Sequence, residues 1–267
     1  MLLRQRNRCG LFGIEVREER RTGGDFWEHA GIVGIGAPMP RLQTKPLVLA
    51  ALLAASWPAA RAQASCSSDG QPPPVALLER FISADCEACW SAPDTPRPQT
   101  GALAIDWIVP CAQGEGAPLS AAASRDALQR LAALGRPAPA DATTLRRTAL
   151  AGAQRLRVAH GLPFNDYIGA SIELRPARSG PWTAWLLLVE TIAAGSEGTP
   201  VERNLARNLL VLSWDGRRAH AARRLFESRP MAIAANARPE RLRVVGWVED
   251  ARGRIRSIAQ TVCVPER

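Results

Sequence analysis

VALLERFISADCEAC (residues 75–89) decides the fold expected for this chain. Its first part, residues 75–82, is apolar and follows Pro73-Pro74, so it predicts a buried strand. Asp85 can cap a short helix that opens at the cysteine pair. A C-x-x-C pair between a strand and a helix is typical of proteins that exchange thiols and disulfides. The stretch therefore predicts an α/β unit that presents Cys86 and Cys89.

The residues that follow extend this α/β pattern. GALAIDWIVP (residues 101–110) predicts a second strand, and residues 120–134 and 142–160 predict amphipathic helices. If the two strands are parallel neighbours, their carboxyl ends meet at one sheet edge, where ligand sites of open α/β sheets gather. Cys111 would then lie near Cys86 and Cys89 as a third thiol or disulfide partner.

The pattern changes after Gly161. Strands without intervening helices are expected at six places, separated by turn signals such as Asp215-Gly216: residues 167–174, 182–191, 208–214, 231–235, 242–248 and 255–262. Such a series predicts an antiparallel sheet or sandwich. We therefore expect an α/β domain over residues 65–160, followed by an antiparallel all-β, sandwich-like domain over residues 161–267.

Residues 39–64 have the features of a secretory signal peptide. Arg41 and Lys45 precede the apolar run LVLAALLAA (residues 47–55), and Ala60-Arg61-Ala62 offers a cleavage site. Residues 1–38 then read as a misassigned extension before the true start at Met39. Two alternatives stay open: a cytoplasmic tail before an uncleaved anchor, and a lipoprotein signal that ends at Cys66. Export predicts a periplasmic or secreted protein in which disulfides can form.

The cysteines after this segment are odd in number: Cys66, Cys86, Cys89, Cys111 and Cys263. In a redox interpretation Cys86 is the nucleophile and Cys89 resolves the mixed disulfide. The same pair can instead be a static structural disulfide. Cys66 can form a structural bridge with Cys111 or with Cys263, and the sequence does not decide between them.

Composition and motifs argue against several other functions. The net charge is +9, but the arginines are scattered as pairs rather than clustered with aromatic platforms, which disfavours nucleic-acid binding. His160 and His220 are the histidines after residue 64, too few for a His-rich metal site, although two sulfurs can hold Cu(I). Phosphate-loop, zinc-protease and nucleophile-elbow motifs do not occur in the sequence. We therefore predict no cofactor, no metal and no stable membrane span once the signal is cleaved.

Several segments resemble the DUF1223 family of exported bacterial proteins. LERFISADCEAC (residues 78–89) is similar to the family's ELFTSQGCSSC strand and cysteine pair, and AIDW (residues 104–107) is similar to its HVDYW strand. Weaker likenesses continue at residues 185–190, 202–208 and 244–250. The resemblance implies a thioredoxin-like fold for the first domain. The family's proline after the second cysteine is displaced here to Pro93, and Leu162-Pro163 is the one candidate for a cis-proline that faces the cysteines.

Two hypotheses about function follow. In the first, the protein exchanges thiols and disulfides with an exported protein partner through Cys86 and Cys89. In the second, it is a non-catalytic periplasmic module whose cysteines form structural disulfides and whose β half binds a partner.

Overall fold

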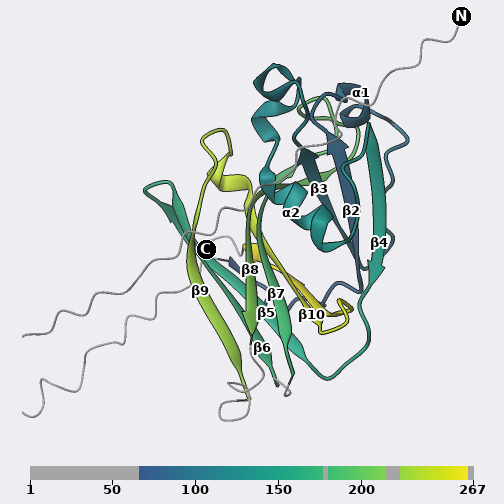
Figure 1. Ribbon diagram of the computed structural model, residues 1–267. Coiled ribbons are helices and arrows are strands. Elements are labelled where there is room, and N and C mark those ends of the chain that lie inside the picture. The colour runs from purple at the N-terminus through teal and green to yellow at the C-terminus, as the bar shows by residue number, and fades with distance from the viewer. Residues whose placement is uncertain (1–65, 177–179, 215–222, 264–267) are drawn as a thin grey trace, which may run out of the picture. The chain divides into compact units, whose positions relative to one another are not determined.

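The computed structural model describes residues 66–176, 180–214 and 223–263 (Figure 1). The expected extension at 1–38 and signal peptide at 39–64 lie outside these ranges. The described strands are β1 Cys66–Ser67, β2 Ala76–Ser83, β3 Ala102–Val109, β4 Ala142–Thr148, β5 Arg155–Phe164, β6 Tyr167–Arg175, β7 Trp182–Ile192, β8 Arg203–Trp214, β9 Leu225–Ala232, β10 Leu242–Asp250, β11 Ile255–Gln260 and β12 Val262–Cys263. The described helices are α1 Glu87–Trp90, α2 Arg125–Ala133 and 3-10 turns at Gly114–Gly116, Ser120–Ala122 and Pro239–Arg241.

The strands form two sheets. The larger sheet has the order β11-β10-β7-β8-β3-β2-β4, and the smaller has the order β12-β1-β5-β6-β9. β2 and β3 are parallel neighbours from Ala76–Ala102 to Ser83–Val109, which is the condition under which the sequence placed Cys111 near the cysteine pair. β8 joins β3 in parallel at Asp106–Leu205, while the other pairs are antiparallel. Strands from both sides of residue 160 therefore share one sheet.

The expected fold class, a thioredoxin-like α/β domain followed by a separate β domain, is wrong. About half of the described chain is strand, and the described α-helices are α1 with four residues and α2 with nine. Too little helix is present to cover both faces of a sheet, as an α/β domain requires. The molecule is better described as two packed β-sheets with one helix, α2, against the β2–β3 region. Neither described α-helix has the length and apolar content needed to cross a membrane.

The helix predicted over residues 142–160 is replaced by β4 and the first part of β5. Along Ala142–Thr148 the exposure alternates residue by residue, which is the period of a strand. Thr143 and Thr144 are β-branched and favour the extended backbone. β4 pairs with β2 at the edge of the large sheet, and its Arg146 and Arg147 are the kind of residue that discourages edge-to-edge association.

The two sheets pack face to face through an apolar core. Val158, Ile168 and Ile172 of the small sheet belong to the same buried cluster as Leu186, Val244 and other residues of the large sheet. Gly246 of β10 lies close to the small sheet, because a Cβ at this position would lie 2.5 Å from Val158 Cγ1. A second cluster lies on the opposite face of the large sheet, beneath Ala127 and Leu131 of α2.

Candidate functional site

Cys86 and Cys89 form a disulfide at the end of β2, with an S–S distance of 1.96 Å. β2 ends at Ser83, and a tight turn follows in which Cys86 N donates to Ser83 O at 3.0 Å. Ser83 Oγ also donates to Asp85 Oδ1 at 2.6 Å, which holds the turn. Cys86 occupies the N-cap of α1, and Cys89 N donates back to Cys86 O at 3.1 Å. The pair therefore sits between a buried strand and a helix, as expected.

Cys86 and Cys89 differ in the residues that surround them. Both are half-buried, but Cys89 packs against a small apolar cluster that includes Ile82, Ala84 and Ile108. The cluster lies at the carboxyl ends of β2 and β3. Because α1 is a single turn of four residues, its macrodipole is weak and is not a strong reason for thiolate stabilisation at Cys86. The contact of Cys89 with this apolar cluster is the stronger asymmetry between the two cysteines.

An open pocket of about 430 Å³ lies beside α1. It is lined by residues of α1 and of two loops: Glu87, Ala88, Trp90, Ser91, Leu119, Glu197 and Gly198. Trp90, which follows the second cysteine, forms part of its wall and is only 8% exposed. A polypeptide segment that approached the disulfide from this side would meet an indole wall and two carboxylates.

Trp90 fixes α1 to the loop between β7 and β8. Its Nε1 donates to Glu197 O at 2.8 Å. Arg203 of β8 donates from Nη2 to Trp90 O at 2.6 Å, and the Arg203 guanidinium lies 4.5 Å from the centroid of the indole ring. Such cation–π contacts are strongest where water is excluded. The helix that carries the cysteines is thus anchored by a residue more than 100 positions away in the chain.

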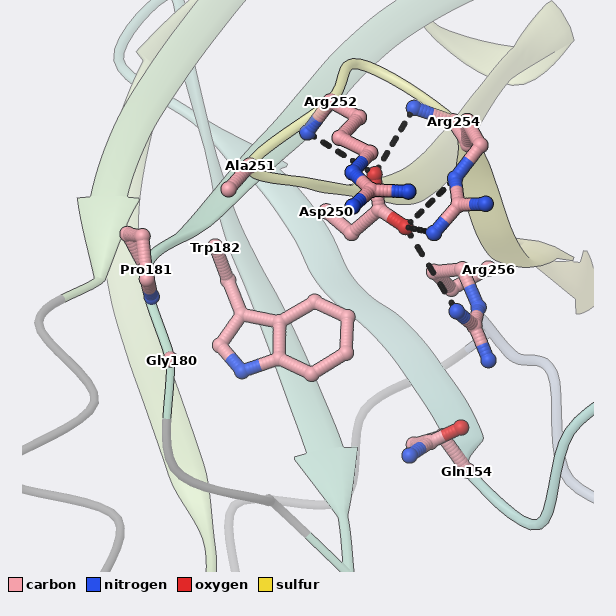
Figure 2. Close-up of a pocket in the computed structure, with 9 residues that line it drawn as sticks. All are labelled: Gln154, Gly180, Pro181, Trp182, Asp250, Ala251, Arg252, Arg254 and Arg256. Carbon is pink, nitrogen blue, oxygen red and sulfur yellow. Dashed lines mark hydrogen bonds and ion pairs between the residues drawn. The ribbon is translucent and has the colours of Figure 1, made fainter.

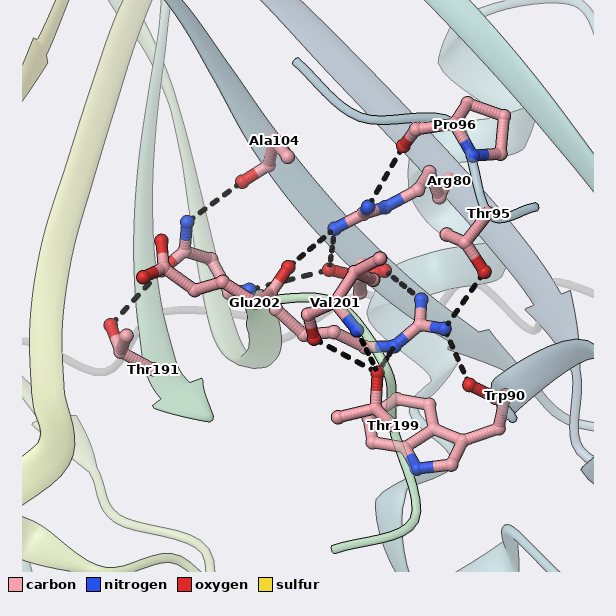
Figure 3. A network of polar contacts seen from close by, with 12 residues as sticks. Arg80, Trp90, Thr95, Pro96, Ala104, Thr191, Thr199, Val201 and Glu202 are labelled. Atoms are coloured by element: carbon pink, nitrogen blue, oxygen red, sulfur yellow. Dashed lines mark hydrogen bonds and ion pairs between the residues drawn. The ribbon is translucent and has the colours of Figure 1, made fainter. Parts of the chain in front are cut away.

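Beneath α1 lies a buried ionic network that Figure 3 shows in detail. Asp106 of β3 accepts from Arg80 Nη2 at 2.6 Å and from Arg203 Nη1 at 2.7 Å. None of the three side chains is more than 2% exposed. Asn204 completes the network, with its backbone N 3.3 Å from Asp106 Oδ2 and its amide donating to Ala104 O at 3.0 Å.

Two guanidinium groups share one carboxylate in this network, and neutral acceptors take up several of the remaining donors, although the buried Nε of Arg80 has no hydrogen-bond partner among the described residues. Arg80 donates to Pro96 O at 3.0 Å and to Glu202 O at 3.2 Å, and Arg203 Nε donates to Thr199 Oγ1 at 2.8 Å. Burial lowers the pKa of Arg203, Asp106 opposes that effect, and the positive charge of Arg80 adds to it. Removing a single partner from such a network would leave an uncompensated buried charge.

Cys111 is the free cysteine of the described residues, and it is half-buried. It follows β3 and packs against the same apolar cluster as Cys89. The parallel pairing of β2 and β3 is the reason, since it brings both strand ends to one edge of the sheet. The structure thus brings Cys86, Cys89 and Cys111 to one region.

Cys66 and Cys263 form the second disulfide, with an S–S distance of 2.02 Å. The two residues face each other across the β1–β12 pair, which decides the question that the sequence left open. His160 of β5 lies beside them, with Nε2 4.0 Å from Cys263 Sγ and Nδ1 2.9 Å from Gly161 O. Metal ions bind thiolates, so these three side chains are not a metal site while the disulfide is intact.

The structure does not bring Pro163 into the cysteine region as a facing cis-proline. Pro163 lies in β5 of the small sheet, whereas the cysteine pair follows β2 of the large sheet. The cis X-Pro bond of the described chain is Arg175-Pro176, at the end of β6.

Sequence reasoning missed the Arg80–Asp106–Arg203 network. A signal was present: Glu79 and Arg80 interrupt the apolar run of β2, and charged residues in a buried strand require partners. Glu79 forms an ion pair with Arg130 of α2 on one face of the sheet, and Arg80 forms one with Asp106 on the other face. The sequence could not predict that Arg203 is the second partner of Asp106, because 97 positions separate the two residues.

Comparison with known proteins adds no assignment. No family model matches the chain, and no curated protein matches it significantly. The resemblance to the DUF1223 family therefore stays a prediction from the motifs.

Proposed function

We propose that this protein exchanges thiols and disulfides with an exported protein partner through Cys86 and Cys89. The observation that carries the proposal is the half-buried disulfide at the carboxyl end of β2, beside an open pocket and one turn from its Trp90 anchor. Two disulfides in one chain, together with the signal-like residues 39–64, support a location outside the reducing cytosol.

The chemistry needs a partner that carries two thiols. A partner thiolate attacks Cys86 Sγ, the S–S bond to Cys89 breaks, and Cys89 leaves as a thiolate. The second partner thiolate then attacks the partner sulfur of the mixed disulfide and releases Cys86. The partner loses two electrons and two protons, and the cysteine pair takes them up as two thiols. The reverse sequence reduces a partner disulfide.

The packing of Cys89 supports Cys86 as the sulfur that the partner attacks. Cys89 lies against the cluster of Ile82, Ala84 and Ile108, which restricts access from the protein side. Cys111 packs against the same cluster and is proposed as a third thiol, able to attack Cys89 and shift the disulfide. In the alternative function, a non-catalytic periplasmic module, both disulfides are permanent.

Equilibration with a glutathione redox buffer tests the proposal. The purified protein is incubated at graded potentials, quenched with acid and alkylated, and each cysteine is quantified by mass spectrometry. We expect Cys86 and Cys89 to titrate together with a midpoint above about −300 mV, whereas Cys66 and Cys263 stay oxidised. A Cys86–Cys89 bond that stays oxidised as firmly as Cys66–Cys263 would falsify the exchange proposal and favour the structural module.

Single variants then assign the roles. Cys89→Ser should accumulate a mixed disulfide with glutathione at Cys86, and Cys86→Ser should accumulate less at Cys89 because that sulfur is more enclosed. Cys111→Ser tests the third thiol, since it removes the free thiol that packs against the same cluster as Cys89. If Cys111→Ser leaves both the midpoint and the labelling pattern unchanged, the role of Cys111 as a third thiol is wrong.

A further inference from the structure

A second pocket, of about 420 Å³, lies on the small-sheet side of the β10–β11 turn and is independent of the cysteines (Figure 2). It is lined by the turn, by the start of β7 and by the segment before β5: Gln154, Gly180, Pro181, Trp182, Asp250, Ala251, Arg252, Arg254 and Arg256. The indole of Trp182 forms an apolar wall, and the three arginines stand at its other side. Asp250 is the sole carboxylate of this lining.

Asp250 holds the arginines but does not use all their donors. Its Oδ2 accepts from Arg254 Nε at 3.0 Å and Nη2 at 2.8 Å, and lies 3.5 Å from Arg256 Nη1. Its Oδ1 accepts from the backbone N of Arg252 at 3.0 Å and of Arg254 at 3.1 Å. The Arg252 guanidinium has no hydrogen bond or ion pair with any described residue.

Buried polar atoms at the pocket are also without partners. Gln154 is 8% exposed, yet its Oε1 has no hydrogen-bond partner among the described residues, and the same holds for the buried Nε of Arg256. Unsatisfied buried polar atoms are rare in folded proteins and call for an explanation such as a ligand or ordered water. Gly152 leaves room for these groups, because a Cβ there would lie 2.7 Å from Gln154 Oε1 and 3.5 Å from Arg256 Nη2.

The charges at the pocket do not balance. Burial alone would raise the pKa of Asp250, but its hydrogen bonds from Arg254 and Arg252 lower it to about 2, so the carboxylate is ionised at neutral pH. Three guanidinium groups thus face one negative charge, and like charges at close range repel one another. An anion of charge −2 would neutralise this excess and accept the unused donors. Guanidinium groups match phosphate and carboxylate oxygens in geometry.

We propose that the pocket of Gln154, Trp182, Arg252, Arg254 and Arg256 binds a small dianion through its phosphate or carboxylate oxygens. Arg252 and Arg256 supply the free donors, and Asp250 keeps Arg254 in place beside them. The indole of Trp182 contacts the apolar part of the ligand. The proposal does not depend on the redox state of any cysteine.

Isothermal titration with phenyl phosphate, and separately with the dicarboxylate succinate, tests the site on the full chain at about pH 8, where both probes are dianions. We expect saturable binding of one equivalent of at least one of the two probes, weakened by added salt because charge attraction drives it. Binding of phenyl phosphate alone assigns a phosphate ligand, and binding of succinate alone assigns a carboxylate ligand. Absence of saturable binding with both probes overturns the proposal.

Three variants separate a built site from general attraction to a basic protein. Arg252→Gln removes a guanidinium that has no hydrogen bond or ion pair with a described residue, so the fold should be kept and affinity should fall by about tenfold or more. Gln154→Glu has nearly the same shape and places a negative charge beside Arg256, so it should also weaken binding. Arg136→Gln removes an exposed arginine outside the pocket and is the matched control. Equal affinity loss in Arg252→Gln and Arg136→Gln, or no loss in Arg252→Gln, contradicts the site.

Discussion

Arg203 and Trp90 are joined twice: the Arg203 guanidinium lies 4.5 Å from the indole centroid, and its Nη2 donates to Trp90 O at 2.6 Å. Trp90 directly follows Cys89, so a fully buried arginine of β8 holds the end of the cysteine-bearing helix. Arg203 in turn is fixed by Asp106 of β3. The position of the disulfide therefore depends on residues at three distant places in the sequence.

Arg203→Met should destabilise the protein and expose the disulfide. Breaking one side of a buried ionic network costs about 3–5 kcal/mol in the free energy of unfolding. Loss of the Trp90 anchor should also let α1 move, so reduction of Cys86–Cys89 by dithiothreitol should be faster. Urea unfolding and stopped alkylation time courses measure the two effects. Arg207→Met is the control, since Arg207 lies on the same strand as Arg203 and pairs with the buried Glu190 of β7. If both variants accelerate reduction equally, the anchor has no specific role.

The two disulfides should contribute unequally to stability. Cys66–Cys263 closes 197 positions of chain and Cys86–Cys89 closes three. From loop-closure entropy we expect the paired serine variant of the first to lose about 5 kcal/mol and that of the second about 2 kcal/mol. Urea unfolding at fixed protein concentration measures both. Comparable losses would show that the denatured chain retains structure or that strain offsets the entropy.

Gly246→Ala should weaken the packing of the two sheets. The new Cβ would lie 2.5 Å from Val158 Cγ1 and 3.0 Å from Ile172 Cδ1, so these side chains or the strands that carry them must shift. Overpacking of this kind typically costs about 1–3 kcal/mol. Gly169→Ala in β6 is the control, because no atom lies within 4 Å of a Cβ placed there. Thermal unfolding should show a lower midpoint for Gly246→Ala alone; equal midpoints would contradict the close approach.

Stability should fall as pH decreases through the histidine range. Burial lowers the pKa of His160 below its ordinary value of 6.5, the Gly161 carbonyl opposes this, and Arg243 adds to it. The unfolded chain therefore takes up the proton first, and the loss begins near the unfolded pKa and continues down to the folded one. His160→Gln should flatten the decline between about pH 7 and pH 5.5, a window above the ordinary carboxyl range. Urea midpoints that decline in parallel for both proteins would show that His160 does not cause it.

At lower pH, acid should remove the contribution of the Asp250 carboxylate to the free energy of unfolding. The pKa of Asp250 is about 2 in the folded protein against an ordinary 3.8, so its stabilising effect is present above 3.8 and is lost as pH falls towards 2. Asp250→Asn should lose stability at neutral pH and show a shallower decline in that acid window. Unfolding curves from pH 5 downward, on the order of half a unit apart, resolve the window. An unchanged slope would mean that the Arg254 contacts do not favour the charged carboxylate.

Local pattern predicted many elements correctly. β2, β3, β6, β7 and β10 were expected within a residue or two, since each is an apolar or alternating run between turn signals. The shared location of the three cysteines followed from the sequence only on the condition that β2 and β3 are parallel neighbours, and the structure meets that condition. The helix expected over 142–160 was wrong, because an Arg-rich segment of mixed periodicity fits a helix face and an edge strand equally well until its neighbour β2 is known.

The amino-acid sequence by itself determined where the cysteine pair lies: after an apolar strand, where a short helix begins, which is a consequence of short-range pattern. Only the tertiary structure decided that strands from both halves share one sheet, that Cys66 pairs with Cys263, and that Arg203 anchors Trp90. These depend on strand order and on contacts between residues about 100 to 200 positions apart. Such contacts are selected by how the whole core packs and how buried charges find partners, which no local segment encodes.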